Sequence, residues 1–440
     1  MTGRIPTAAS PSLALVLPAL LLPTTALAAG AGHGQEGVPP DSITLLVFLA
    51  ILVGAIGAHQ VVERMQKRLL FISVAEFIIL GVVLGPAVVP EVAPFVDLTV
   101  VAPVFAFAAG WVGLLYGLEL DFSAPGLSRP LRLAFMSWIV TSAVVTAATL
   151  WFLRSGLWID VVGWDMAWPC AIVLGAAAAS GSSSAVDLLS ERYHDAATHL
   201  LPLLRRTTRL SNALAILTFG LVFCVWRVSE GSLDVPERGV LVTIGIGVTL
   251  GLLFFLFIGK DQSANKAFLS MVGILVFASG AAFFLQLSAL AVNLILGATL
   301  AQTRRGGRLA SQLERTQRPV TLILLIFAGA MWNPPALPAA AVLGAGFIAL
   351  RLLGRMLGVT LATGGTPLRG DLWRGLLDQG DVAVAMAVGF QLVYEHPAVD
   401  LVHTTILVAV VLHELATPRV LQGLLVDAGE VDTDPIATGS

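Results

Sequence analysis

Long apolar segments separated by short polar connections recur along almost the whole chain. Most segments hold about 18 or more apolar residues, the length that a helix needs to cross a bilayer. The pattern predicts an all-α polytopic membrane protein with about 13 transmembrane helices. The predicted spans lie near residues 43–60, 69–90, 98–118, 132–153, 164–190, 209–227, 239–259, 267–285, 287–303, 318–333, 336–358, 373–394 and 400–417.

The first 28 residues have the pattern of a secretory signal peptide. A short apolar core at 13–22 precedes Ala26-Leu27-Ala28, which matches a cleavage site made of small residues. The alternative is an uncleaved first helix, but two prolines and the shortness of the core argue against it. We therefore expect a signal peptide at 1–28 and a periplasmic segment at 29–42.

Lysine and arginine gather in alternate connections between the predicted spans. One set of connections is rich in them, whereas the other set holds Arg154, Arg227 and Arg238. The positive-inside rule places the rich set in the cytoplasm, including the connection at 310–316. The mature N-terminus is then outside and the C-terminus inside, which agrees with signal cleavage. We expect a multi-pass protein of the cell inner membrane.

The composition supports a membrane protein and excludes several other classes. Of the 440 residues 57% are hydrophobic and 12% charged, about half the charged fraction of a soluble domain. Cys170 and Cys224 fall in apolar segments, so we expect buried thiols rather than a disulfide or a metal site. No catalytic or phosphate-binding motif occurs. We expect neither enzymatic activity, nor a cofactor, nor nucleic-acid binding.

Polar residues interrupt two of the predicted spans. The fifth span contains Ser180 to Ser184, and the twelfth contains Asp378-Gln379-Gly380-Asp381. The second and ninth spans share a similar sequence, ILGVVLG at 79–85 and ILGATLA at 295–301. Spans with these separations run in opposite directions, so the chain is predicted to contain an inverted repeat. Interruptions at matching places in such repeats indicate a binding site near mid-membrane. Close helix packing through small residues is the alternative; it explains the serines but not Asp381.

Five short motifs, in this order, resemble those of the monovalent cation:proton antiporter family, which includes sodium/hydrogen exchangers and Kef-type potassium/proton antiporters. The resemblance covers roughly residues 43–425. It implies an inverted-repeat fold with two crossing interrupted helices, a homodimer, and exchange of sodium or potassium for protons. The motifs are EFIILGVVLGP at 76–86, YGLELD at 116–121, the serine run followed by Glu191-Arg192, RLLGRMLG at 351–358 and DQGDVAVA at 378–385.

The chain departs from this family at the position that matters most for ion binding. The resemblance implies an aspartate in the sixth span that binds the cation and the proton alternately. The matching stretch here is RLSNALAILTFG, with Asn212 followed by Ala213. The aspartate that sodium exchangers carry in the first interrupted helix is also replaced, by Ser182. The exchangeable charge must therefore come from another residue.

Three carboxylates could replace the missing one. Asp381 is the first candidate because it lies in the second interruption, whereas Asp187 follows the serine run by about one turn and Glu76 lies inside the second span. Asp187 could instead belong to the membrane interface. The full set of candidate ion- and proton-binding residues is Asp381, Asn212, Ser182, Ser183, Asp187, Gln379 and Asp378, with supporting charges from Arg351, Arg355 and Glu76.

Several buried or interfacial charges have two interpretations. Arg351 and Arg355 are four residues apart and so share one helix face; they could extend to the membrane interface or serve a polar interior. Asp381 could pair with either of them. In the last span His403, His413 and Glu414 could form a proton relay, although interfacial histidines are the more common case.

Three functional classes follow from these observations. The first is cation/proton exchange with a relocated carboxylate, and the second is uncoupled, differently coupled or anion-directed transport on the same fold. The third is a membrane sensor or scaffold, which is disfavoured because only a short acidic tail at 426–440 follows the transmembrane domain at 43–425. That tail also leaves no room for the nucleotide-binding regulatory domain of many Kef-type relatives. Ion selectivity depends on cavity geometry that the sequence does not specify.

Overall fold

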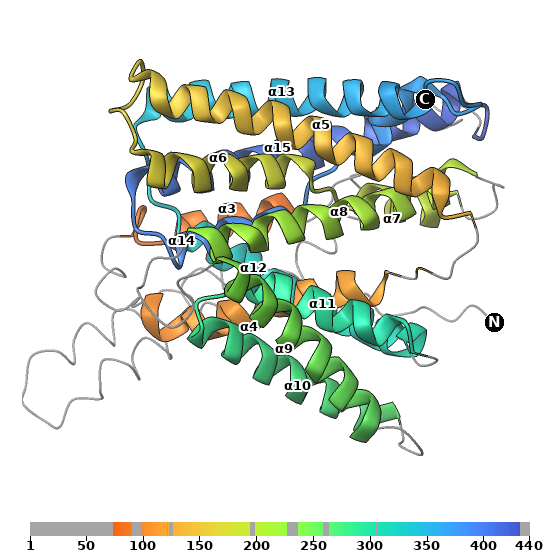
Figure 1. Cartoon of the computed structure of the whole chain (residues 1–440). Helices are drawn as coiled ribbons and strands as arrows, with labels where there is room; N and C mark the ends of the chain where they lie inside the picture. Colours follow the sequence, from red (N-terminus) through yellow and green to blue (C-terminus); the bar gives the residue numbers. More distant parts are fainter. Residues whose placement is uncertain are drawn as a thin grey trace, which may run out of the picture.

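The computed structural model describes an all-helical chain, and its described residues contain no strand (Figure 1). These residues are 74–89, 98–120, 122, 126–193, 199–226, 236–257, 264–303 and 306–431. The helices are α3 (Val74–Leu84), α4 (Leu98–Leu118), α5 (Ser128–Ser155), α6 (Trp164–Ala179), α7 (Ser184–Arg192), α8 (Leu200–Val225), α9 (Pro236–Phe257), α10 (Ala264–Phe284), α11 (Ala289–Ala301), α12 (Gly306–Ala330), α13 (Leu337–Thr363), η4 (Gly370–Leu376), α14 (Asp381–Gln391) and α15 (Pro397–Asp427).

Every predicted span from the second onward coincides with a helix or with a pair of short helices. Six spans among the described residues are long and apolar enough to cross a membrane, and shorter apolar helices accompany them. The chain is therefore a multi-pass membrane protein. The signal peptide and the first span fall outside the described residues, so the total of 13 stays a prediction.

Several helices extend beyond the predicted apolar spans into polar sequence. The connection expected at 310–316 is helical and belongs to the first turns of α12. Likewise α8 begins nine residues before its predicted span and includes Arg205 and Arg206. Apolar length marks where a helix enters the hydrocarbon, not where its hydrogen-bonded turns begin, which explains these differences.

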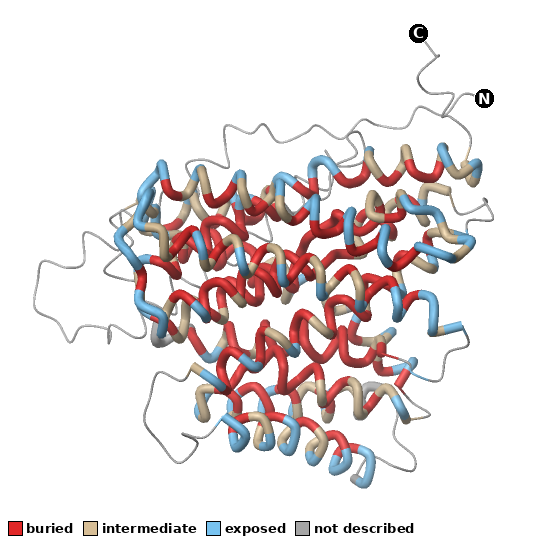
Figure 2. The backbone as a smooth tube through the Cα atoms, turned by 45° about the horizontal axis from the view of Figure 1, so that its top comes forward, coloured by how far each residue is buried: buried red, intermediate tan, exposed pale blue. Residues whose placement is uncertain are grey.

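The helices form two bundles. One consists of α5, α6 with α7, α8, α13, η4 with α14, and α15; the other consists of α3, α4 and α9 to α12. In Figure 1 the first bundle occupies the upper part, and α4, α9, α10 and α11 occupy the lower part. Figure 2 shows that buried residues form a continuous interior through both, while exposed residues lie on the outer faces. The bundles meet mainly where α14 contacts α4 and α12, and where α8 contacts α9 and α11.

Glycine contacts confirm the inverted repeat. Gly329 of α12 lies so close to α3, and Gly117 of α4 so close to α11, that a side chain at either position would clash with the facing backbone. The neighbours of Gly329 are Ile78, Gly81 and Val82, and those of Gly117 are Leu294, Gly297 and Ala298. Leu294, Gly297 and Ala298 correspond in order to Ile78, Gly81 and Val82. The separation in sequence is the same in all three pairs, and it equals the separation between the two ILG sequences. The α3–α12 and α4–α11 pairs are therefore equivalent contacts of the two repeats.

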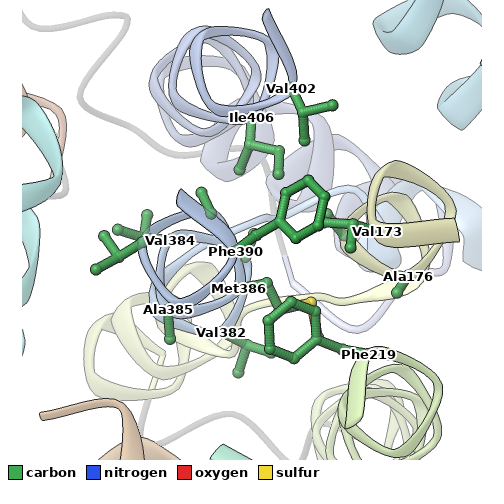
Figure 3. Packing of buried hydrophobic residues seen from close by; sticks show 14 of the residues in the cluster. Val173, Ala176, Phe219, Val382, Val384, Ala385, Met386, Phe390, Val402 and Ile406 are labelled. Atoms are coloured by element: carbon green, nitrogen blue, oxygen red, sulfur yellow. The ribbon is translucent and has the colours of Figure 1, made fainter. Parts of the chain in front are cut away.

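A dry core holds the second short helix, α14, in place. Figure 3 shows Phe390 of α14 between Val402 of α15 and Val173 of α6, and Met386 beside Phe219 of α8. Each of these side chains is almost fully buried. Because apolar side chains enclose α14 on several sides, its N-terminal residue Asp381 is held at a fixed position.

Candidate functional site

The two polar interruptions are helix breaks that touch each other. α6 ends at Ala179 and α7 begins at Ser184, while η4 ends at Leu376 and α14 begins at Asp381. The backbone N–H of Ser182 donates to the carbonyl oxygen of Asp378 at 3.2 Å. The predicted crossing of two interrupted helices is therefore confirmed. Each break exposes helix termini whose backbone groups need partners other than their own helix.

Arg351 joins the two breaks. Its guanidinium donates to Ala178 and Ser180 in the first broken helix, both at 3.0 Å. It also donates to Leu377 at 2.5 Å and Asp378 at 3.0 Å in the second, in every case to the carbonyl oxygen. An arginine supplies five donors in a rigid fork and so serves several carbonyl groups at once.

Arg355 serves mainly the first break. Its guanidinium donates to the carbonyl oxygens of Ala179 at 2.6 Å and Ser180 at 2.7 Å, and to the Ser137 hydroxyl at 3.0 Å. Arg351 and Arg355 are 0% and 1% exposed, so extension of their side chains to the interface was the wrong interpretation. Carbonyl groups freed by the breaks are their partners, which makes them structural charges of a polar interior.

Asn212 holds the unwound backbone of the first break. Its Oδ1 accepts from the N–H of Gly181 at 2.7 Å, and its Nδ2 donates to the Gly181 carbonyl at 3.0 Å. The neighbouring Ser211 hydroxyl donates to the Ala179 carbonyl at 2.8 Å. Asn212 is completely buried, and both polar atoms of its amide bind Gly181. Its position is consistent with a backbone clamp.

Asp378 is a carboxylate of one break that caps the helix of the other. Its Oδ2 accepts from the backbone N–H of Ala185 in the first turn of α7 at 3.0 Å, and its Oδ1 accepts from the N–H of Gln379 at 3.1 Å. The Ser182 hydroxyl of the first break lies 2.8 Å from the Ser184 hydroxyl. A negative charge at a helix N-terminus is stabilised by the helix dipole and by unpaired N–H groups.

Gln379 lies between the two aspartates and is fully buried. Its Nε2 donates to the carbonyl oxygen of Ala177 at 2.9 Å. Its Oε1 is also buried and accepts no hydrogen bond from the described residues. The break thus contains a buried amide oxygen with free acceptor capacity, close to two carboxylates.

Asp381 connects the two bundles. Its carboxylate accepts from the Tyr116 hydroxyl of α4 at 3.0 Å and from the Gln317 amide of α12 at 3.2 Å. It also accepts from the N–H of Val382 at 2.9 Å. The side-chain partners are therefore Tyr116 and Gln317 rather than Arg351 or Arg355, so the alternative pairing with an arginine was wrong.

Sequence reasoning did not identify these two partners as site residues. Tyr116 opens the YGLELD motif, so its motif was recognised but its role was not. Gln317 lies in the first half of α12 with no distinguishing pattern around it. Both reach Asp381 from helices of the other bundle, and such a contact depends on how the two bundles pack.

Of the remaining carboxylate candidates, Asp187 adjoins the first break and Glu76 lies in α3. Asp187 pairs with Arg205 and accepts from the Ser183 hydroxyl at 2.9 Å, and its side chain is 47% exposed. Glu76 lies in the first turn of α3, a helix that packs mainly on α12 and α15.

The histidines of α15 are buried, not interfacial, and each bonds to a backbone carbonyl. His403 Nε2 lies 2.9 Å from the oxygen of Ala328, and His413 Nδ1 lies 2.7 Å from that of Ala409. They are roughly three turns apart along α15. This separation does not favour a direct proton relay between them.

Ala213 lies at the wall of a different space. It follows Asn212 on α8 and lines an apolar groove between α8, α9 and α11. The described residues contain no cluster of metal-ligating side chains. The side chains of Cys170 and Cys224 are both buried. The polar centre of the protein therefore consists of the two breaks, their two aspartates and the two arginines of α13.

Comparison with known proteins identifies the fold. No protein-family model and no curated protein matches this sequence. Among solved structures, the chain is similar to the sodium/proton antiporter MjNhaP1 of Methanocaldococcus jannaschii at pH 8, with a TM-score of 0.61, 16% identity, and coverage of 85% of this chain and 99% of that one. An electron-microscopy structure of the same antiporter gives a TM-score of 0.56 and 14% identity, covering 89% and 99%. The chain therefore has the inverted-repeat fold of a sodium/proton antiporter.

Proposed function

We propose that this protein exchanges a monovalent cation, sodium or potassium, for protons by alternating access, with Asp381 as the exchangeable charge. The observation that carries the proposal is the position of Asp381: it is buried at the start of α14, beside the crossing of two broken helices. A buried carboxylate is neutralised either by a proton or by a cation, so it can bind the two in turn. Oxygen ligands suited to a cation are adjacent in Asp378, the Gln379 amide and Ser182.

The two-bundle architecture supports a mechanism for the exchange. Asp381 belongs to one bundle, whereas Tyr116 and Gln317 belong to the other. A movement of one bundle against the other would break these two hydrogen bonds and open the carboxylate to water on one side. Arg351 would travel with the broken helices because it binds both of them within one bundle, so the site would move as a unit.

The missing aspartate at position 213 keeps a second function under consideration. Transport that is uncoupled from protons, or coupled in another way, is favoured by Ala213 itself, since alanine cannot titrate. A membrane sensor remains a third and weaker alternative. We further propose the signal peptide at 1–28, the cytoplasmic C-terminus, the inner-membrane location and a homodimer, each as the sequence and its family resemblance predict.

A proteoliposome assay with an entrapped pH dye tests the proposal. Sodium or potassium added outside should release protons from vesicles carrying the parent protein, and Asp381→Asn should abolish this signal. The amide keeps the shape and accepts hydrogen bonds but cannot exchange a proton for a cation. Asp371→Asn, at an aspartate outside the membrane spans, is the matched control and should exchange as the parent does.

The reciprocal variant separates the alternatives. Ala213→Asp restores the aspartate that the family resemblance implies, so it should add to a cation-dependent signal. If Asp381→Asn exchanges as well as the parent, Asp381 is structural and Asp187 or Glu76 takes its place as candidate. If the parent gives no cation-driven signal while Ala213→Asp does, uncoupled transport is the better description.

A further inference from the structure

An ion pair joins the two bundles about one turn from the contact between Tyr116 and Asp381. Glu119 directly follows α4, and its backbone N–H donates to the carbonyl oxygen of Leu115 at 3.2 Å, so it continues the helical turn. Arg209 of α8 reaches this carboxylate from the bundle of the broken helices. Its Nη2 donates to Oε1 of Glu119 at 3.0 Å, and its Nε lies 2.9 Å from Oε2. The pair must separate if the bundles move apart here.

Spacing at the end of α4 relates this ion pair to the carboxylate of Asp381. Tyr116 and Glu119 are three residues apart, so their side chains lie on one face of the helical turn. The Tyr116 hydroxyl donates to Asp381 at 3.0 Å, and the charge of Asp381 acts electrostatically on Glu119. The end of α4 therefore contacts both Asp381 and Arg209 across the boundary between the bundles.

Exposure decreases from the surface toward Asp381 along three carboxylates. The side chain of Asp187 is 47% exposed, and that of its partner Arg205 is 36% exposed. The Glu119 side chain is 12% exposed, whereas Asp381 is buried. Arg205 and Arg209 are four residues apart on one face of α8, and the charge of Asp187 also acts on Glu119. The Arg209–Glu119 pair thus lies between the exposed pair and the buried carboxylate.

Its place at the boundary distinguishes the Arg209–Glu119 pair from ion pairs within one bundle. Arg374 and Asp427, for example, both belong to the bundle of the broken helices. A movement of that bundle as a unit keeps such a pair intact but separates Arg209 from Glu119. Two enclosed charges are costly to hold apart unless water or new partners reach them. Opening at this point therefore requires water to enter beside Asp381, as expected of charged groups along an ion pathway.

We propose that the Arg209–Glu119 ion pair is an inner gate, which separates Asp381 from the cytoplasm when closed and opens when the bundles part between α4 and α8. The proposal rests on the exchange proposed above and on the charge pattern, which places this end of α8 toward the cytoplasm. While the gate is open, Asp381 exchanges its ligand with that side. The two gate residues control access to Asp381; they do not bind the transported cation.

A reporter cysteine behind the gate tests the closed state without transport. Tyr116→Cys places a thiol at a buried position next to Asp381, and both native thiols are buried. In this background Glu119→Gln and Arg209→Gln should each raise the rate of labelling by a small hydrophilic thiol reagent about fivefold, the change in open population expected for loss of one partly exposed ion pair. Arg209→Lys keeps the charge and should label within about twofold of the reporter alone.

Arg205→Gln is the matched control, on the same face of α8. It removes an ion pair whose partners both belong to one bundle, so it should label as the reporter alone does. Label on the fully buried Cys170 identifies a variant that unfolds, in which case the other gate variant decides. Equal rates for Glu119→Gln and the reporter would overturn the gate, and so would an equal increase in Arg205→Gln.

A cross-link across the gate tests whether it opens during exchange. Glu119→Cys with Arg209→Cys, joined by a short bifunctional thiol reagent, should lose cation-driven proton release in proteoliposomes and regain it when the link is reduced. Arg374→Cys with Asp427→Cys, joined in the same way within one bundle, should exchange as before. Exchange that survives the link across the gate would overturn the proposal. A parent that does not exchange would refute the proposed function, while the labelling rates would still decide the gate.

Discussion

Asn212→Ala tests whether the clamp on Gly181 holds the first break in shape. The substitution removes the acceptor for the Gly181 N–H and the donor to the Gly181 carbonyl, which lie 2.7 and 3.0 Å from the amide. Leaving one buried polar group without a partner costs about 1–3 kcal/mol. Two such groups should lower the free energy of unfolding by about 2–6 kcal/mol. The midpoint of thermal unfolding in detergent should fall by several degrees.

Two further variants decide whether the clamp is the cause. Ser211→Ala is the matched control. It removes the hydrogen bond from the Ser211 hydroxyl to the Ala179 carbonyl, but that carbonyl still accepts from Arg355 at 2.6 Å. It should cost no more than about 1 kcal/mol, the usual net value of one hydrogen bond. Asn212→Asp keeps an oxygen for the Gly181 N–H but loses the amide donor, and should fall between the other two. If Asn212→Ala unfolds at the same temperature as Ser211→Ala, the clamp does not stabilise the break and the reasoning is refuted.

Three other predictions concern the repeat, the topology and a surface charge. Gly81→Ala places a Cβ against the carbonyl of Ile326 and should lower the unfolding midpoint, while Gly273→Ala, which has open space around it, should not. Ser311→Cys should resist an impermeant thiol reagent in intact cells and react with it after lysis. Both native thiols are buried, so labelling reports on the introduced cysteine alone. Ready labelling from outside would reverse the topology. Asp371 has its pKa held below the ordinary 3.8 by a hydrogen bond from the guanidinium two residues earlier. The charged Asp371 therefore stabilises the fold above pH 3.8, and this stabilisation is lost as the pH falls through the lowered pKa. The parent should be more stable than Asp371→Asn at neutral pH, and the difference should vanish in acid. A difference that grows in acid would contradict the assignment.

Much of the fold could be predicted because the bilayer restricts what a membrane chain can do. Backbone groups in hydrocarbon must be satisfied within the chain, so apolar segments of sufficient length become helices. Polar residues within such segments then mark places where a helix cannot continue unassisted, which is how the breaks at Ser180–Ser184 and Asp378–Asp381 were predicted. The matched ILG sequences were enough to predict the inverted repeat, and the glycine contacts confirm it.

The partners of the site residues were decided by tertiary structure. The sequence placed Arg351 and Arg355 on one helix face, but it could not show that they bind carbonyl groups freed by two distant breaks. Nor could it show that Tyr116 and Gln317 reach Asp381 from the other bundle. Spacing along a helix determines which side chains share a face, whereas contacts between helices depend on bundle packing. The sequence by itself thus determined the helices, their interruptions and the residues displayed there, and the packing of two bundles decided which partner each residue meets.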